Sequence, residues 1–80
     1  MNTIYLMSRT DKVEDASALT KTEDQIVDKA VSWYWGDLTH PNDGQLTIDV
    51  DFESLIVELH DSATGKVTVY YLFAFDRRVI

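Results

Sequence analysis

The fold is decided by residues 46–60, which read LTIDVDFESLIVELH. Apolar side chains take every second position before and after residues 51–54, and this period of two is typical of strands with one buried face. The phase slips by one residue between Val50 and Leu55, which a four-residue turn over 51–54 explains. Antiparallel pairing then sets apolar residues opposite each other: Val50 and Leu55, Ile48 and Val57, Leu46 and Leu59. The alternative is one long strand with a bulge near Glu53.

A further strand follows the turn-forming residues 61–65, where Gly65 can take a positive φ. Its alternate positions are apolar: Val67, Val69, Tyr71, Phe73 and Phe75. Pairing Leu59 with Val67 and Val57 with Val69 keeps the same face inward. We therefore expect a three-stranded meander. Its opposite face would carry three apolar residues, Ile56, Tyr70 and Leu72. These side chains would be exposed to solvent unless another segment or a second copy covers them.

One helix is predicted over residues 22–35. Capping-box patterns begin at Thr20 and at Thr22. Glu23 and Asp24 occupy the first turn, where the helix dipole favours anions. Apolar residues then recur at helical spacing: Ile26, Val27, Ala30, Val31 and Tyr34. Gly36 is expected to end the helix, supported by Pro41 shortly after it.

The remaining segments complete the domain. Residues 3–9 predict a first strand, because they are β-branched and aromatic and contain no breaker. Residues 10–21 are polar, and three interpretations stay open: a loop, a helical turn, or a short strand over 13–19. The 80 residues therefore predict a single α+β domain spanning 1–80, of order β-α-β-β-β or with an extra strand before the helix. One helix would pack on one face of a mainly antiparallel sheet.

Charge and composition exclude several classes of protein. Fourteen acids against seven bases give a net charge of −7, which argues against direct binding of nucleic acid or of an anionic membrane. The absence of cysteine excludes disulfides and thiolate zinc sites. We expect no signal peptide and no membrane span, because no apolar stretch is long enough. The cytoplasm is the expected compartment.

Catalytic and metal-binding patterns are weak. His40 and His60 are the only histidines, and both are expected as exposed turn residues. Asp49, Asp51 and Glu53 would project from one face of a single strand about 6.6 Å apart, as a hard-cation site, a row of phosphate-like anions, or simply a solvated face. No nucleophile motif or phosphate-binding glycine pattern is present. We therefore expect no enzyme, no metal and no cofactor.

The triplet Trp33-Tyr34-Trp35 is unusual, because three consecutive rings span about 200° of a helix. One sheet cannot easily bury all three, so at least one tryptophan should lie at the rim or on the surface. Tryptophan is a preferred anchor of protein interfaces. The alternative is that one ring packs over the sheet edge and the other covers the loop at residues 37–44.

The capped helix 22–35 and the acids of helix and strands also carry a resemblance. With the order of elements, they resemble small α+β anti-CRISPR proteins made by phages and mobile elements, although no single motif is shared. That resemblance implies a stoichiometric inhibitor that occupies the basic nucleic-acid site of a defence complex in the host cytoplasm. The acids concerned are Glu23, Asp24, Asp28, Asp49, Asp51, Glu53 and Glu58.

The sequence therefore predicts that the chain acts by stoichiometric protein–protein binding. The expected partner is a basic nucleic-acid-binding protein or complex, with no direct contact to nucleic acid or membrane. The expected partner-binding residues are these seven acids together with Trp33 and Trp35. The alternative function is a homo-oligomeric interaction module, for example a homodimer through the uncovered sheet face.

Overall fold

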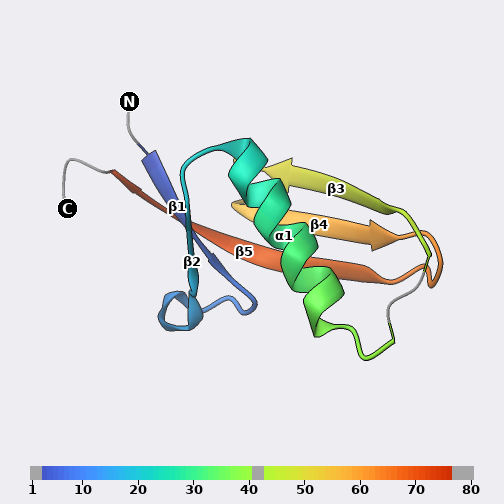
Figure 1. The fold of residues 1–80 in the computed structure, drawn as a ribbon. Coiled ribbons are helices and arrows are strands. Elements are labelled where there is room, and N and C mark those ends of the chain that lie inside the picture. The colour runs from blue at the N-terminus through green and yellow to red at the C-terminus, as the bar shows by residue number, and fades with distance from the viewer. Residues whose placement is uncertain (1–2, 41–42, 77–80) are drawn as a thin grey trace.

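A computed structural model describes residues 3–40 and 43–76 of the chain (Figure 1). Pro41 of the expected helix stop lies outside the described residues. The elements in chain order are β1 (Thr3–Ser8), the 3-10 turn η1 (Val13–Asp15), β2 (Ala18–Thr20), α1 (Glu23–Asp37), β3 (Leu46–Asp51), β4 (Ile56–Asp61) and β5 (Val67–Asp76). The polar segment left open by the sequence therefore contains both a helical turn and the extra strand.

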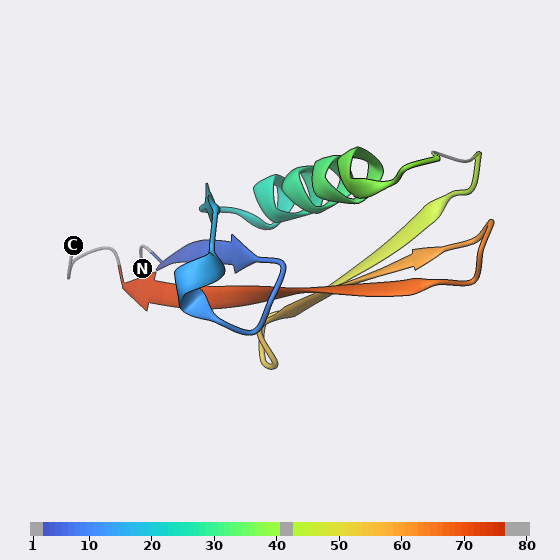
Figure 2. The ribbon, with the colours of Figure 1, turned by 90° about the horizontal axis from the view of Figure 1, so that it is seen from below.

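The strands form one antiparallel sheet in the order β2-β1-β5-β4-β3. The α+β arrangement in a single domain is confirmed, with α1 packed against one face of the sheet. Viewed edge-on in Figure 2, the described residues place α1 on one side and no α-helix on the other. β1 pairs with residues 71–76 of β5 and β4 pairs with residues 67–71. This offset makes the molecule long, with extents of 42 × 21 × 18 Å.

The helix begins as predicted but ends later. Thr22 is the N-cap, and its Oγ1 accepts a hydrogen bond from the Gln25 amide at 3.2 Å. Gln25 Oε1 accepts in turn from the Lys21 amide at 2.7 Å, so both side chains satisfy amides that the helix leaves free. The prediction that Gly36 stops the helix is wrong. Gly36 lies inside α1 and does not have a positive φ. Asp37 extends the last turn by forming an ion pair at 2.8 Å with Arg9, the residue that follows β1.

The hairpin of β3 and β4 has the predicted face but a shifted register. Val50 pairs with Val57 and Ile48 with Leu59, two residues away from the expected partners. The turn runs over residues 52–55 rather than 51–54. It is closed by the Asp51 side chain, which accepts from turn amides, while Leu55 takes a positive φ of 57°. A shift of two residues keeps every side chain on its face.

The predicted register of β5 against β4 is wrong by one residue, which changes the face of every side chain on β5. Leu59 pairs with Thr68 and Val57 with Tyr70, one residue away from the predicted partners. Five residues, 62–66, separate β4 from β5, and the Asp61 amide donates a hydrogen bond to the Lys66 carbonyl at 3.0 Å. A one-residue slip turns a strand over, so Tyr70 and Leu72 face the helix and are only 4% and 2% exposed. Ile56 stays on the opposite face, which it shares with Val67, Val69, Tyr71, Phe73 and Phe75.

The core lies between α1 and the sheet. It joins the buried helix residues Ile26, Ala30 and Tyr34 to residues of four strands: Met7, Ala18, Val57, Leu59, Tyr70 and Leu72. Full burial of an aliphatic side chain of this size stabilises a fold by about 1.5–3 kcal/mol. Because this cluster holds nine of the ten buried apolar side chains of the described residues, it fixes how α1 lies on β1, β2, β4 and β5.

Candidate functional site

The charges of the chain are segregated along the sequence. Residues 22–65 contain ten of the fourteen acids but only one of the seven bases, Lys29. This segment forms α1, β3 and β4, and β3 and β4 are neighbours at one edge of the sheet beneath the helix. The fold therefore gathers most of the negative charge into one half of the molecule, which we call the acidic half (α1, β3, β4 and their loops).

Three acids of this half have structural partners. Asp61 is buried and accepts from the Tyr34 hydroxyl at 2.5 Å and from the Ala63 amide at 2.9 Å. The hydrogen bond that Tyr34 donates to Asp61 is the main cause that raises the pKa of Tyr34, and burial raises this pKa further. The hydrogen bond from Arg9 lowers the pKa of Asp37. Amides of the β3–β4 turn, first that of Ser54, lower the pKa of Asp51, so this acid closes a turn.

Seven other acids remain in the acidic half: Glu23, Asp24, Asp28, Asp43, Asp49, Glu53 and Glu58. Within residues 3–40 and 43–76, none of their carboxylates lies within 4.0 Å of a Lys or Arg nitrogen. All are exposed except Glu58, which is half-buried. Asp43 is absent from the predicted set of binding acids, because it lies in a turn-forming segment without periodicity. An unneutralised carboxylate on a surface attracts basic groups from a partner.

Asp49 and Glu58 form the sharpest feature of this half. They are direct cross-strand partners on β3 and β4, so two like charges stand opposite each other on the sheet. Such a pair destabilises a sheet. His60 Nε2 lies 3.4 Å from Glu58 Oε1 and offsets the repulsion only when protonated. The repulsion between Asp49 and Glu58 therefore lowers the stability of the folded sheet at this position.

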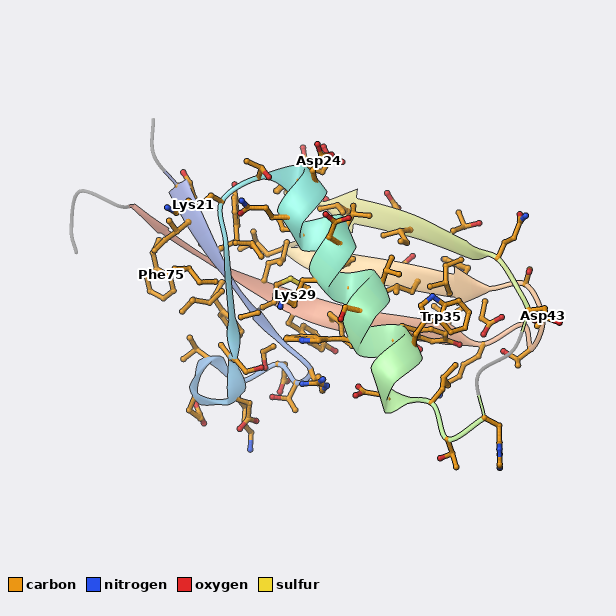
Figure 3. The ribbon with its side chains drawn as sticks, viewed as in Figure 1. Lys21, Asp24, Lys29, Trp35, Asp43 and Phe75 are labelled. Atoms are coloured by element: carbon orange, nitrogen blue, oxygen red, sulfur yellow. The ribbon has the colours of Figure 1, made fainter. Side chains whose placement is uncertain are left out.

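The predicted partner-binding acids fall on two sides of the acidic half. Glu23, Asp24 and Asp28 belong to α1, on one face of the sheet. Asp49 and Glu58 lie on the face away from α1, because their strand neighbours Val50, Val57 and Leu59 point toward it. Figure 3 shows Asp24 at the start of α1, the end of the helix nearest the end of β3. The acids therefore border the β3 edge from both faces rather than forming one flat patch.

Both tryptophans are partly buried. The Trp33 ring packs edge-on against Tyr70 at 5.2 Å between centroids, and the Arg9 guanidinium lies 4.2 Å from the Trp33 ring. The Trp35 ring packs edge-on against Tyr34 at 5.3 Å between centroids, and Figure 3 shows it beside the C-terminal half of α1. Each ring therefore extends the core while its residue stays partly exposed. Their role as anchors for a partner stays a prediction.

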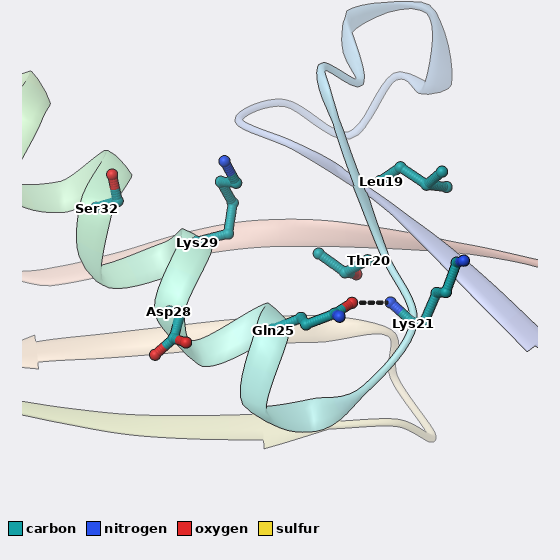
Figure 4. Close-up of a pocket in the computed structure, with 7 residues that line it drawn as sticks. All are labelled: Leu19, Thr20, Lys21, Gln25, Asp28, Lys29 and Ser32. Atoms are coloured by element: carbon teal, nitrogen blue, oxygen red, sulfur yellow. Dashed lines mark hydrogen bonds between the residues drawn. The ribbon is translucent and has the colours of Figure 1, made fainter.

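A polar groove of about 420 Å³ lies between β2 and α1 (Figure 4). It is lined by Leu19, Thr20, Lys21, Gln25, Asp28, Lys29 and Ser32. Its two lysines and one carboxylate are exposed, and its only hydrogen bond drawn in Figure 4 joins Lys21 to Gln25. The groove holds no histidine, and its side chains do not form a nucleophile–base arrangement.

The sheet face away from α1 contains Ile56, as predicted, but not Tyr70 and Leu72, which face the helix. On β1, β2 and β5 this face, which we call the outer face, is formed by Ile4, Leu6, Ser8, Leu19, Val67, Val69, Tyr71, Phe73 and Phe75. None of these residues is charged. The signal was present in the sequence, because residues 67–75 are apolar at nearly every position, as in strands buried on both faces.

The described residues contain no group of three or more His, Asp or Glu side chains that could hold a metal ion, so His40, His60 and the strand acids do not converge there. No helix among them has the length and apolar character needed to cross a membrane. Comparisons with protein families, curated proteins and solved structures found no match for this chain.

Proposed function

We propose that this protein acts by stoichiometric binding of its acidic half to a basic surface on another protein, without catalysis. The observation that carries the proposal is the cross-strand pair of Asp49 and Glu58. A like-charge pair lowers the stability of the sheet, and a single lysine at either position would remove the cost. Two opposed carboxylates with no lysine or arginine of the described residues beside them are explained if a cationic partner neutralises them on binding.

The narrower proposal concerns the kind of partner. Proteins that hold nucleic acid present grooves of lysine and arginine that are matched to regularly spaced anions. The exposed acids around the β3 edge offer carboxylates to such a groove from both faces of the sheet. We propose a nucleic-acid-binding complex of the CRISPR type, with this chain as a small phage-type inhibitor acting in the host cytoplasm.

Binding of this kind has a clear physical signature. Complementary charge speeds association and makes the affinity fall as salt rises. The partly exposed Trp33 and Trp35 would supply contacts that salt does not screen. The inhibitor would then compete with nucleic acid for one site at one equivalent of chain per site.

The test is an affinity capture of the tagged chain from bacterial lysate at low salt and at about 0.5 M salt, followed by mass spectrometry. The captured complex is then titrated with labelled nucleic acid and increasing amounts of the chain. We expect displacement of the nucleic acid at one equivalent, weakened at high salt. A captured protein that keeps its nucleic acid would overturn the proposal.

Charge-reversal variants make the test specific. Asp49→Lys should weaken capture by at least tenfold, and it should not do so by unfolding, because it removes a repulsion. Asp11→Lys changes the net charge by the same amount at an exposed position outside the acidic half, and it should leave capture nearly unchanged. Equal effects of both variants would mean that only net charge matters and that the acidic half is not the site.

A further inference from the structure

We propose that the open edge of β3 binds an extended basic segment of the partner protein as an additional strand of the sheet. The inference rests on the proposed function, because it names the element of the acidic half that makes the contact. β3 stands last in the sheet order, so within the described residues it pairs with β4 alone (Figure 1). The unpaired edge of a strand is a template on which a segment of another chain can pair.

The main-chain groups that face this edge belong to alternate residues of β3. The Ser62 amide donates to the Gln45 carbonyl at 3.0 Å, so Gln45 and Ser62 form a hydrogen-bonded pair directly before β3. Such pairs alternate with non-hydrogen-bonded pairs along an antiparallel ladder. The residues whose amides and carbonyls point away from β4 are therefore Leu46, Ile48 and Val50. Each of them offers one donor and one acceptor to an added strand.

The edge of β3 lacks the features that keep other strands from pairing with an edge. β3 has six residues in unbroken register with β4, without a bulge, and it contains neither proline nor lysine. Natural edge strands are protected by those features or by being very short. β2, at the other edge of the sheet, has only three residues and is followed by Lys21. The two edges therefore differ, and β3 is the one long enough to hold an added strand.

The charge beside the edge selects a basic occupant. A residue of the added strand would lie opposite Asp49 in a non-hydrogen-bonded pair, where side chains approach most closely. A lysine or arginine at that position would face Asp49, with Glu58 one strand further along the same row. A second copy of β3 would instead bring further acids against this row, because every charged residue of β3 is an aspartate. Opposed like charges destabilise a sheet, whereas opposite charges stabilise it.

The side of β3 that faces α1 selects apolar residues at the intervening positions. Leu46, Ile48 and Val50 are half-buried and pack against the core. Gln25 and Lys29 line the groove beside β2, so the opposite flank of α1, toward β3, carries the half-buried Val27 and Val31. An added strand would extend this apolar surface with every second side chain. The segment that fits therefore alternates basic and apolar residues, with its cations on the face away from α1.

The first test uses three labelled synthetic peptides and the full chain, followed by fluorescence anisotropy at low salt. One peptide alternates lysine and valine, a second has the same composition with its lysines in one block, and a third is the alternating peptide N-methylated on every second amide. N-methylation keeps the charge but removes the donors that a strand needs. We expect the alternating peptide to bind at least about tenfold more tightly than the other two. Equal binding of the three, or no binding of the alternating peptide, would overturn the inference.

Ile48→Pro tests the edge within the protein. The proline ring replaces an amide that points away from β4, so the hydrogen bonds between β3 and β4 are kept, as at natural edge strands. This variant should bind the alternating peptide at least about tenfold more weakly than Ile48→Ala, which loses a similar apolar contact but keeps the amide. Equal binding by the two variants would contradict strand addition. If Ile48→Pro unfolds the chain, the three peptides with the wild type carry the test.

Capture from lysate separates this inference from the proposed function. Asp49→Lys should weaken capture of any partner that binds the acidic half, whereas Ile48→Pro should weaken it only if the partner adds a strand. Capture that is lost in Asp49→Lys but retained by the folded Ile48→Pro would overturn the inference and leave the proposed function intact. Capture that survives Asp49→Lys would overturn the proposed function itself.

Discussion

Asp49→Lys is expected to stabilise the fold, although Asp49 is an exposed residue. Directly opposed side chains on neighbouring strands have their Cβ atoms about 5 Å apart, and their charges lie about 6 Å apart. Two unit charges at that distance in water interact by about 0.7 kcal/mol. The substitution turns a repulsion from Glu58 into an attraction of similar size, so the free energy of unfolding should rise by about 1 kcal/mol. For an 80-residue chain this corresponds to an increase in Tm of about 4–8 °C.

The assay is urea and thermal unfolding of the wild type, Asp49→Lys and Asp11→Lys at low salt and at about 1 M salt. The Asp11 variant reports the effect of net charge alone, because Asp11 has no cross-strand acid. The excess stability of Asp49→Lys over Asp11→Lys should be largest at low salt, and it should shrink at 1 M, where the Debye length is about 3 Å. Equal stability of the two variants, or an excess that salt does not change, would refute the like-charge argument on which the proposed function rests.

Four further predictions test the fold. Leu72→Ala should cost about 2–5 kcal/mol in urea unfolding, and Val67→Ala less than about 0.5 kcal/mol, whereas the reverse order would contradict the register of β5. Gly36→Ala should stabilise the helix by about 0.5–1 kcal/mol, because nothing lies within 4 Å of the added methyl. Gly44→Ala should lower Tm, because its methyl would lie 2.7 Å from the Ala63 amide nitrogen, and an unchanged Tm would contradict this contact. Burial raises the pKa of Tyr70 to about 12. Its contribution to stability is therefore complete below pH ~10 and is lost as the pH rises toward 12, so Tyr70→Phe should remove a late step from the ultraviolet absorbance titration.

Helix position and fold class could be predicted because several local signals agreed. Thr22, Gln25 and the spacing of Ile26, Ala30 and Tyr34 all point to one helix with one buried stripe, and the structure confirms it. The end of α1 could not be predicted, because the ion pair that extends it joins Asp37 to Arg9, 28 residues away in the sequence. The position of Gly36 alone predicts that the helix ends there, but the tertiary contact between Asp37 and Arg9 overrides this local preference.

The faces of β5 were unpredictable for a different reason. A strand that is apolar on one face and polar on the other has a single sensible register, but Val67–Phe75 is apolar on both. The register is set instead by the length of the turn that Asp61 and Lys66 close. The acids of the candidate site were all visible in the sequence, whereas their division between two faces of the sheet depends on the packing of α1 against β3.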